Sequence, residues 1–230
     1  MCFIQAPADK NLAWYLAMEE YVGQHITDYE RGVFFTWIVE PTVIFGRHQE
    51  MSAEVNLDYC RAHNIQVVQR KSGGGCVYAD KGNLMLSYIT PSTHAEKVFR
   101  QYLDTVANLL IRLGVNAVKT EHNDILVDGR KVSGNACYAL KTGTIVHGTL
   151  LYDVDFRVLQ QAITPPQHKL LKHGVQSVRQ RVTNLKPILH DFSDIYQLSD
   201  YICNNICTET HQLTDVDIAA INLIEKTYQN

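Results

Sequence analysis

Residues 124–136 read DILVDGRKVSGNA, two short strand-like stretches on either side of an Asp-Gly pair at 128–129. An Asp-Gly pair in this setting is typical of the turn of a β-hairpin, so two antiparallel strands are expected here. Alternation along the second strand places Lys131, Ser133 and Asn135 on one face. They either form the polar wall of a pocket, or Lys131 is a solvated residue at an edge.

The neighbouring segments extend this hairpin into a sheet. TIVHGTLLY at 144–152 follows a second hairpin signal, Thr-Gly at 142–143. Residues 94–114 have apolar residues spaced three or four apart and end in glycine, which predicts the longest helix. Strands with interposed helices predict an α+β fold with a mixed, largely antiparallel sheet packed with helices.

The rest of the chain fits the same fold class. A helix is expected from Asp9, a good N-cap residue, to about residue 24, and a polar helix at 54–63. We expect residues 1–186 to form one domain and residues 187–230 to add a mostly helical extension to it. Further strands are expected at 33–39, 42–46, 65–70, 76–79, 84–89 and 115–119.

The composition excludes several classes of protein. The 230 residues are 46% hydrophobic and 20% charged, enough for a sizeable core, and the net charge of −3 gives no reason to expect a nucleic-acid or membrane partner. Neither a signal peptide nor a membrane span is recognisable, which favours the cytoplasm. The six cysteines lack CxxC pairs and are expected to be reduced packing residues. A metal site formed by Cys203, Cys207 and His211 is the weaker alternative.

A run of glycines is the first sign of a binding site. SGGGCVYADKGN at 72–83 follows directly on Arg70 and Lys71. Glycines let backbone N–H groups converge on an anion, but they also serve in a bulge or tight turn. The spacing matches neither the P-loop nor the dinucleotide-binding fingerprint. In the strand at 144–152, His147 and Gly148 indicate either close approach of a ligand or a buried histidine bonded to a carbonyl.

These features belong to five motifs that occur in a fixed order. The motifs are RKSGGGCVY at 70–78, HNDILV at 122–127, RKVSGNA at 130–136, HGTLL at 147–151 and SVRQRVTNL at 177–185. Their order resembles the catalytic domain of the lipoate-protein ligase A family, within the biotin and lipoate protein ligase superfamily, over about residues 11–185. The resemblance implies ATP- and Mg²⁺-dependent activation of lipoate to lipoyl-adenylate. It also implies transfer to a lysine of a lipoyl domain, in 2-oxoacid dehydrogenase complexes or the glycine cleavage H protein.

The resemblance also implies roles for individual residues. Lys131 corresponds to the catalytic lysine that contacts the lipoyl carbonyl and the α-phosphate. Asp124 is expected to hold Mg²⁺, together with Asn123, and Arg70 to make charge-assisted contacts with the phosphate. His147 is expected to line the tunnel for the lipoyl chain. The residues expected to bind lipoyl-adenylate are Arg70, Ser72, Gly74, Gly75, Cys76, Val77, Tyr78, Asn123, Ser133, Ala136, His147 and Gly148.

The sequence departs from the family pattern in two ways. His122 stands where an arginine is usual, which predicts a weaker or pH-sensitive phosphate contact. A smaller C-terminal accessory domain is also expected to be absent. The protein could therefore be a lipoyltransferase that uses preformed lipoyl-adenylate or needs a separate accessory protein.

Two further alternatives remain. A cysteine nucleophile, Cys76 or Cys137, is disfavoured because Cys137 lies six residues from Lys131, roughly 20 Å along a regular strand. A non-catalytic module that binds lipoate or lipoyl domains is the other alternative. One basic cluster either steers an acidic lipoyl domain to the site or is an ordinary solvated loop. It comprises Lys169, Lys172, His173, Arg179 and Arg181.

Overall fold

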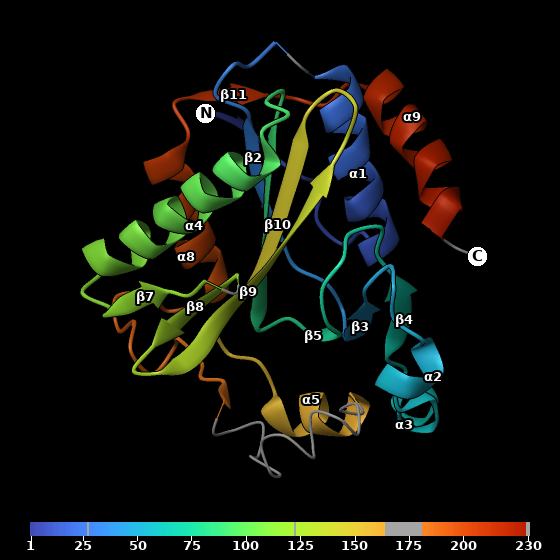
Figure 1. The fold of residues 1–230 in the computed structure, drawn as a ribbon, viewed down its shortest axis with the longest axis vertical. Coiled ribbons are helices and arrows are strands. Elements are labelled where there is room, and N and C mark those ends of the chain that lie inside the picture. Colours follow the sequence, from blue (N-terminus) through green and yellow to red (C-terminus); the bar gives the residue numbers. More distant parts are fainter. Residues whose placement is uncertain (27, 122, 164–180, 229–230) are drawn as a thin grey trace.

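The computed structural model describes residues 1–26, 28–121, 123–163 and 181–228. An eight-stranded sheet runs through the molecule in the order β11-β1-β2-β6-β10-β9-β8-β7 (Figure 1). Strand β1 is parallel to both of its neighbours, and the other strand pairs are antiparallel. The expected α+β fold with a mixed, largely antiparallel sheet is confirmed.

A second, three-stranded sheet has the order β4-β3-β5. Strands β2 and β3 are close in sequence but lie in different sheets. Strand β2 lies between β1 and β6, and β3 lies between β4 and β5. The large sheet consists of β1 (Cys2–Ile4), β2 (Val33–Trp37), β6 (Asn83–Thr90), β7 (Ala117–Lys119), β8 (Asp124–Val127), β9 (Arg130–Ala139), β10 (Thr144–Leu151) and β11 (Glu209–His211), and the small one of β3 (Thr42–Phe45), β4 (Gln66–Gln69) and β5 (Val77–Ala79).

The longest described helix is α4, at the expected place, and Gly114 follows its end with φ +79°. The N-terminal helix begins later than expected. Its cap is Asn11, whose side chain accepts a hydrogen bond from the Trp14 N–H, whereas Asp9 precedes the helix with φ +60°. The helices are α1 (Leu12–His25), α2 (Met51–Glu54), α3 (Leu57–Ala62), α4 (Ala95–Arg112), α5 (Phe156–Ala162), α8 (Ile195–Ile206), α9 (Asp215–Glu225) and the 3₁₀ helix η1 (Lys226–Tyr228).

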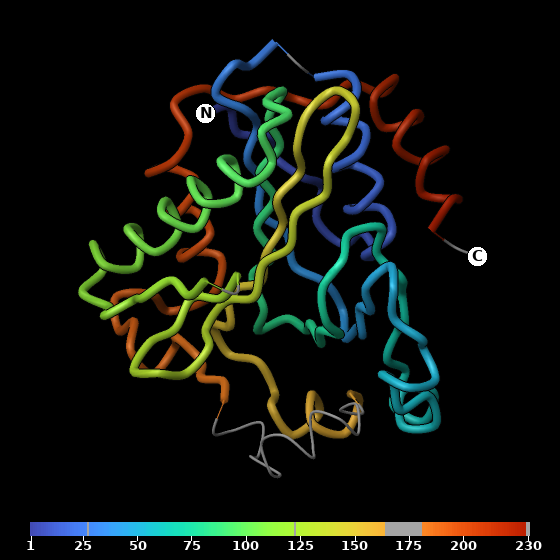
Figure 2. The backbone as a smooth tube through the Cα atoms, in the orientation of Figure 1, coloured from blue at the N-terminus to red at the C-terminus, as the bar shows by residue number. Residues whose placement is uncertain are grey.

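Helix α1 is buried on all sides from Leu12 to Gly23, including Glu19 and Glu20. One side packs on the large sheet, and α9 lies alongside the other (Figures 1 and 2). A helix enclosed in this way needs apolar residues around its whole circumference, and its charged residues need partners. The described part of the segment beyond residue 187 is mostly helical, as expected, and in addition supplies the short strand β11 to the large sheet.

The core is divided by the large sheet. Alternation along β10 sends Val146 toward α4 and α8 and Ile145 toward α1 and α9. A third cluster lies at the small sheet, around Val43 and Tyr78. Within the described residues, no helix is both long and apolar enough to cross a membrane.

Candidate functional site

A cavity of about 280 Å³ lies where α1, the small sheet and strands β9 and β10 meet. Among the residues predicted from the sequence, Ser72, Tyr78 and Ser133 do not line it, although Ser72 lies directly behind its wall. The predicted residues that the cavity brings together are Arg70, Gly74, Gly75, Cys76, Val77, Asn123, Asp124, Lys131, Ala136, His147 and Gly148.

The glycine loop at 72–76 contributes Gly74, Gly75 and Cys76 to one wall of the cavity. Arg70 lies beneath it and is only 6% exposed. Its guanidinium donates to the carbonyl oxygens of Ile44 (3.1 Å), Gly73 (2.8 Å) and Gly75 (2.7 Å). Most of its donors are thus used within the protein, and its charge acts on a ligand mainly through the loop.

The loop itself has the properties of an anion site. Gly74 adopts φ +95°, a conformation that glycine reaches without strain. Within the described residues, the backbone N–H groups of Gly73, Gly74 and Gly75 have no hydrogen-bond acceptor. Two of these glycines line the cavity. Unpaired N–H donors above a buried guanidinium favour a bound anion over a purely structural turn.

A line of buried hydrogen bonds continues from the loop into the core. The hydroxyl of Ser72 lies 2.7 Å from His147 Nε2, and His147 Nδ1 lies 2.8 Å from Glu19 Oε2. The other Glu19 oxygen accepts from Ser87 Oγ at 2.5 Å, which in turn accepts from Trp37 Nε1 at 2.8 Å. The partner of His147 is therefore a carboxylate from α1, not a carbonyl group.

The inner part of the cavity is apolar. It is lined by Leu12 and Leu16 of α1, Trp37, Ile44 and Met85. These side chains suit an aliphatic chain, because they offer no buried polar atom except the Trp37 N–H, which is already bonded. The sequence did not identify them, since their spacing is that of ordinary core residues. The available signal was Glu19, one of two adjacent carboxylates within a mostly apolar helix.

Charged residues lie at the outer end. Lys131 on β9 forms an ion pair with Asp124 on β8, with Nζ and Oδ1 2.8 Å apart. A β-bulge between Ile125 and Leu126 shifts the register of the two strands at this point. A side chain at position 134 would approach the Lys131 ammonium to 2.7 Å, so Gly134 leaves room for the lysine.

Asp124 and Asn123 offer oxygen ligands for Mg²⁺. Magnesium is commonly held by one or two carboxylates together with substrate phosphates, so the chemistry of these two residues fits that ion. Within the described residues, no three His, Cys, Asp or Glu side chains are grouped closely enough to hold a metal alone. The alternative site of Cys203, Cys207 and His211 is not such a group.

The two cysteines considered as nucleophiles are protonated at neutral pH. Burial raises the pKa of Cys76 to about 12, and burial also raises the pKa of Cys137. A thiol nucleophile needs thiolate character, which neither environment provides. Cys137 packs against the core cluster that contains α4 and does not line the cavity.

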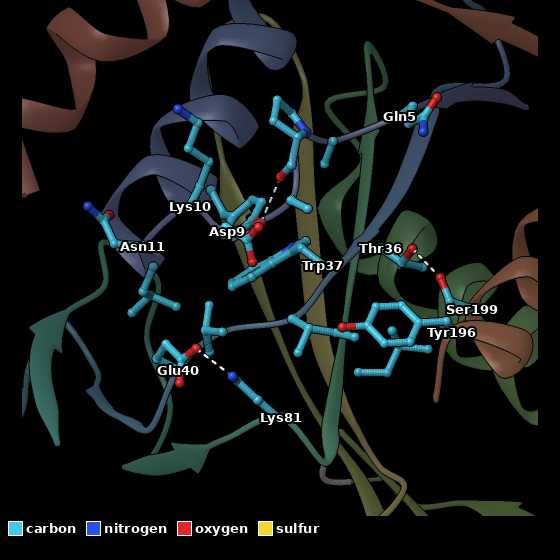
Figure 3. Close-up of a pocket in the computed structure, with 18 of the residues that line it drawn as sticks. Gln5, Asp9, Lys10, Asn11, Thr36, Trp37, Glu40, Lys81, Tyr196 and Ser199 are labelled. Atoms are coloured by element: carbon cyan, nitrogen blue, oxygen red, sulfur yellow. Dashed lines mark hydrogen bonds and ion pairs between the residues drawn. The ribbon is translucent and has the colours of Figure 1, made fainter. Parts of the chain in front are cut away.

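A larger cavity of about 560 Å³ shares Leu12 and Trp37 with the smaller one (Figure 3). Its Lys81 ammonium is 2.8 Å from Glu40, and Thr36 bonds to Ser199 at 2.7 Å. None of the predicted site residues lines it. It lacks a glycine loop, so the smaller cavity is the better candidate.

Part of the predicted site lies outside the described residues. This applies to His122 and to most of the basic cluster, namely Lys169, Lys172, His173 and Arg179. Arg181 is described and exposed.

A family model for the lipoyl protein ligase A/B catalytic domain matches residues 11–207. The chain is 40% identical to lipoate-protein ligase 1 of Staphylococcus aureus over 207 residues, which cover 88% of this chain and 63% of that protein. It is 35% identical to lipoate-protein ligase LplJ of Bacillus subtilis, over 94% of this chain and 67% of that protein. The chain thus spans about two thirds of the length of these curated relatives.

Solved structures show the same fold. A bi-partite lipoate protein ligase from Thermoplasma acidophilum, described with its E2 lipoyl domain, has a TM-score of 0.84 at 23% identity and covers 98% of this chain and 91% of that one. A lipoate-protein ligase A bound with ATP has a TM-score of 0.80 at 22% identity, over 98% and 94% of the two chains.

Proposed function

Because the chain belongs to the lipoyl protein ligase A/B catalytic-domain family, we propose that it is a lipoate-protein ligase. It activates lipoate with ATP to lipoyl-adenylate and transfers the lipoyl group to a lysine of a lipoyl domain. One observation supports this most strongly: a single cavity joins an apolar inner end, a glycine loop with unpaired N–H donors, and the Lys131–Asp124 pair.

The two ends of the cavity suit the two parts of an acyl-adenylate. The apolar end around Leu16, Trp37 and Met85 takes the lipoyl chain. The loop amides of Gly74 and Gly75 donate to the phosphate, with the buried charge of Arg70 behind them. Binding in this orientation brings the carboxyl group of lipoate and the α-phosphate to the outer end, where Lys131 lies.

Lys131 is the catalytic residue of this proposal. Its ammonium stabilises the negative charge that develops as the lipoate carboxylate attacks the α-phosphate and pyrophosphate leaves. In the second step it stabilises the carbonyl oxygen of lipoyl-adenylate while the acceptor lysine attacks and AMP leaves. Asp124 and Asn123 would hold Mg²⁺, which offsets phosphate charge when it is bound.

The remaining predicted residues have supporting roles. Ser72 fixes the loop through its bond to His147, and Ser133 Oγ bonds to Asn135 Oδ1 at 3.2 Å. Tyr78 belongs to the core cluster at the small sheet. We assign Val77, Ala136, Cys76 and Gly148 to the walls that contact lipoyl-adenylate, since all four line the cavity.

The proposed partner is a lipoyl domain of a 2-oxoacid dehydrogenase complex or of the glycine cleavage H protein, and the proposed location is the cytoplasm. The Thermoplasma acidophilum ligase is described with its E2 lipoyl domain, which supports this class of acceptor. The basic cluster that ends at Arg181 would attract an acidic acceptor. Residues 187–230 are proposed to extend the catalytic domain, since β11 and α9 pack on its N-terminal elements.

A second candidate is a lipoyltransferase that works on preformed lipoyl-adenylate or with a separate accessory polypeptide. It is favoured by the bi-partite nature of the archaeal ligase, whose fold this chain shares. Exchange of labelled pyrophosphate into ATP in the presence of lipoate separates the possibilities. A complete ligase catalyses the exchange, whereas a transferase or a pure binding module does not.

A further inference from the structure

Lys71, the residue just before the glycine loop, is held by the C-terminal segment. Its ammonium lies 2.7 Å from Glu20 Oε1 and 3.2 Å from the hydroxyl of Thr227. It also lies 4.3 Å from the ring centroid of Tyr228, within the range of a cation–π contact. The side chain of Lys71 is 34% exposed and that of Glu20 only 10%, so water screens this ion pair incompletely.

Tyr228 contacts both members of this ion pair, because its hydroxyl donates to the same Glu20 carboxylate and its ring lies under the Lys71 ammonium. Glu20, Lys71, Thr227 and Tyr228 therefore form one cluster, called here the Lys71 cluster. Three segments that are far apart in sequence meet in it: helix α1, the start of the glycine loop, and η1.

The C-terminal segment is itself anchored on α1. Trp14 Nε1 donates to Asn222 Oδ1 at 2.8 Å, and the Tyr21 hydroxyl donates to Asp217. Ile221 is fully buried. Helix α9 consequently holds η1 against α1, and the position of Tyr228 does not depend on its contact with Lys71 alone.

The glycine loop is thus held from two sides. Arg70 binds the loop carbonyl groups from the protein interior, while the next residue, Lys71, is bound by the C-terminal segment. The loop needs such support, because glycines lose much conformational entropy when they are ordered. Gly73 and Gly75 have no heavy atom within 4 Å of the position that a Cβ would take, so side-chain packing does not order them.

We propose that the segment 226–228 positions the glycine loop for its anionic ligand by binding Lys71. Thr227 and Tyr228 are then positioning residues of the site, although they lie outside residues 11–207, which carry the family match. The identity of the ligand, lipoyl-adenylate, rests on the function proposed above, whereas the contact between the segment and the loop does not.

The contact can be tested without any ligand by limited trypsin digestion. Trypsin cuts after Lys71, and this bond resists cleavage while the lysine is held. Tyr228→Ala, which removes both the hydroxyl and the ring, is expected to accelerate cleavage between Lys71 and Ser72 by about threefold to tenfold. Tyr228→Phe, which keeps the ring, should have an intermediate effect. Tyr196→Ala is the control, because Tyr196 is 65% exposed on α8 and lines the larger cavity, not the one that the loop lines.

The second measurement is the Kd of a non-hydrolysable sulfamoyl analogue of lipoyl-adenylate, which Tyr228→Ala should raise by about threefold or more. Cleavage after Lys71 at the parental rate would overturn the proposal. Equally accelerated cleavage after Arg100 on α4 would also overturn it, because it would indicate global unfolding. An unchanged Kd despite faster cleavage after Lys71 would overturn it as well. If the parent protein fails to bind the analogue while the cleavage pattern holds, the proposed function is wrong and the loop contact stands.

Discussion

The ammonium of Lys131 lies 2.8 Å from the carboxylate of Asp124, on adjacent antiparallel strands at the outer end of the cavity. Both side chains are partly exposed, 37% and 29%. In the proposed reaction, Lys131 must exchange this partner for the carbonyl group and phosphate of the ligand. Binding of Mg²⁺ by Asp124 would favour that exchange, because it competes with the lysine for the same carboxylate.

Replacing Lys131 should abolish most activity with little effect on folding. Lys131→Ala is expected to reduce the rate of adenylate formation at least about 10²-fold, equivalent to roughly 3 kcal/mol of electrostatic stabilisation. The melting temperature should change little, since ion pairs this exposed contribute about 0–1 kcal/mol. Lys81→Ala is the control, because Lys81 forms a similar ion pair in the larger cavity. Parental activity in Lys131→Ala would show that the assignment is wrong.

Asp124→Asn should raise the concentration of Mg²⁺ needed for activity. The amide retains an oxygen but loses the charge that attracts the ion, so we expect an increase of about tenfold or more. Titration of activity with Mg²⁺ and binding of Mn²⁺ observed by electron paramagnetic resonance would measure it. Asp128→Asn is a suitable control, since Asp128 lies in the adjacent turn with φ +49°, which asparagine tolerates. Identical metal dependence in both variants would exclude Asp124 as the ligand.

The cysteines are expected to be dispensable for the chemistry. The double variant Cys76→Ser, Cys137→Ser should keep activity within about twofold, because burial keeps the pKa of the Cys76 thiol at about 12. Intact-protein mass spectrometry during turnover should show no covalent lipoyl adduct on the parent protein. An inactive double variant, or an adduct at either cysteine, would revive the acyl-enzyme mechanism.

An added side chain should disturb the glycine loop at Gly46, which packs against the loop, but not at Gly73 within it. At Gly46, a Cβ would lie 2.3 Å from the carbonyl oxygen of Gly74, whereas at Gly73 it would meet no atom within 4 Å. Gly46→Ala must therefore displace the loop and is expected to weaken binding of the sulfamoyl analogue at least about tenfold, roughly 1.4 kcal/mol. Gly73→Ala should bind within about threefold of the parent. Equal Kd values for the two variants would contradict the proposed role of the loop in binding.

Docking of α9 on α1 should weaken in acid. Burial alone would raise the pKa of Asp217, but hydrogen bonds from Tyr21 and Thr214 outweigh it and leave the pKa below its usual value. A carboxyl with a lowered pKa stabilises the fold above its ordinary pKa of about 3.9, and this contribution is lost as the pH falls through the lowered value. Asp217→Asn should therefore cost stability at pH 7 and progressively less below about pH 4. Melting temperatures from pH 7 to pH 3 would measure this, with Asp191→Asn as the control.

Local sequence signals predicted the elements well where a short motif determines the backbone. Asp128 and Gly129 both adopt positive φ, at +49° and +74°, as the Asp-Gly pair indicates for a hairpin turn. The periodic pattern of 94–114 likewise identified α4. At the N-terminus the rule was misleading, because Asp9 and Asn11 are both good cap residues and the helix uses Asn11.

The contacts that shape the site were not predictable in this way. Glu19 and His147 lie 128 positions apart in sequence, and their contact depends on α1 lying across β10. The cluster of Lys71 with Tyr228 depends on α9 in the same manner. Neither pairing produces a local sequence pattern. The glycine loop and Lys131, in contrast, lie within motifs of consecutive residues, and the order of those motifs identified them.

The most direct test is incubation of the pure protein with lipoate, ATP and Mg²⁺, followed by mass spectrometry for lipoyl-adenylate and, after addition of a lipoyl domain, for its modified lysine. The proposed ligase activity predicts both products from the parent protein and neither from Lys131→Ala. Absence of lipoyl-adenylate, with transfer restored by synthetic lipoyl-adenylate, would contradict it and make the protein a transferase that depends on an activating partner.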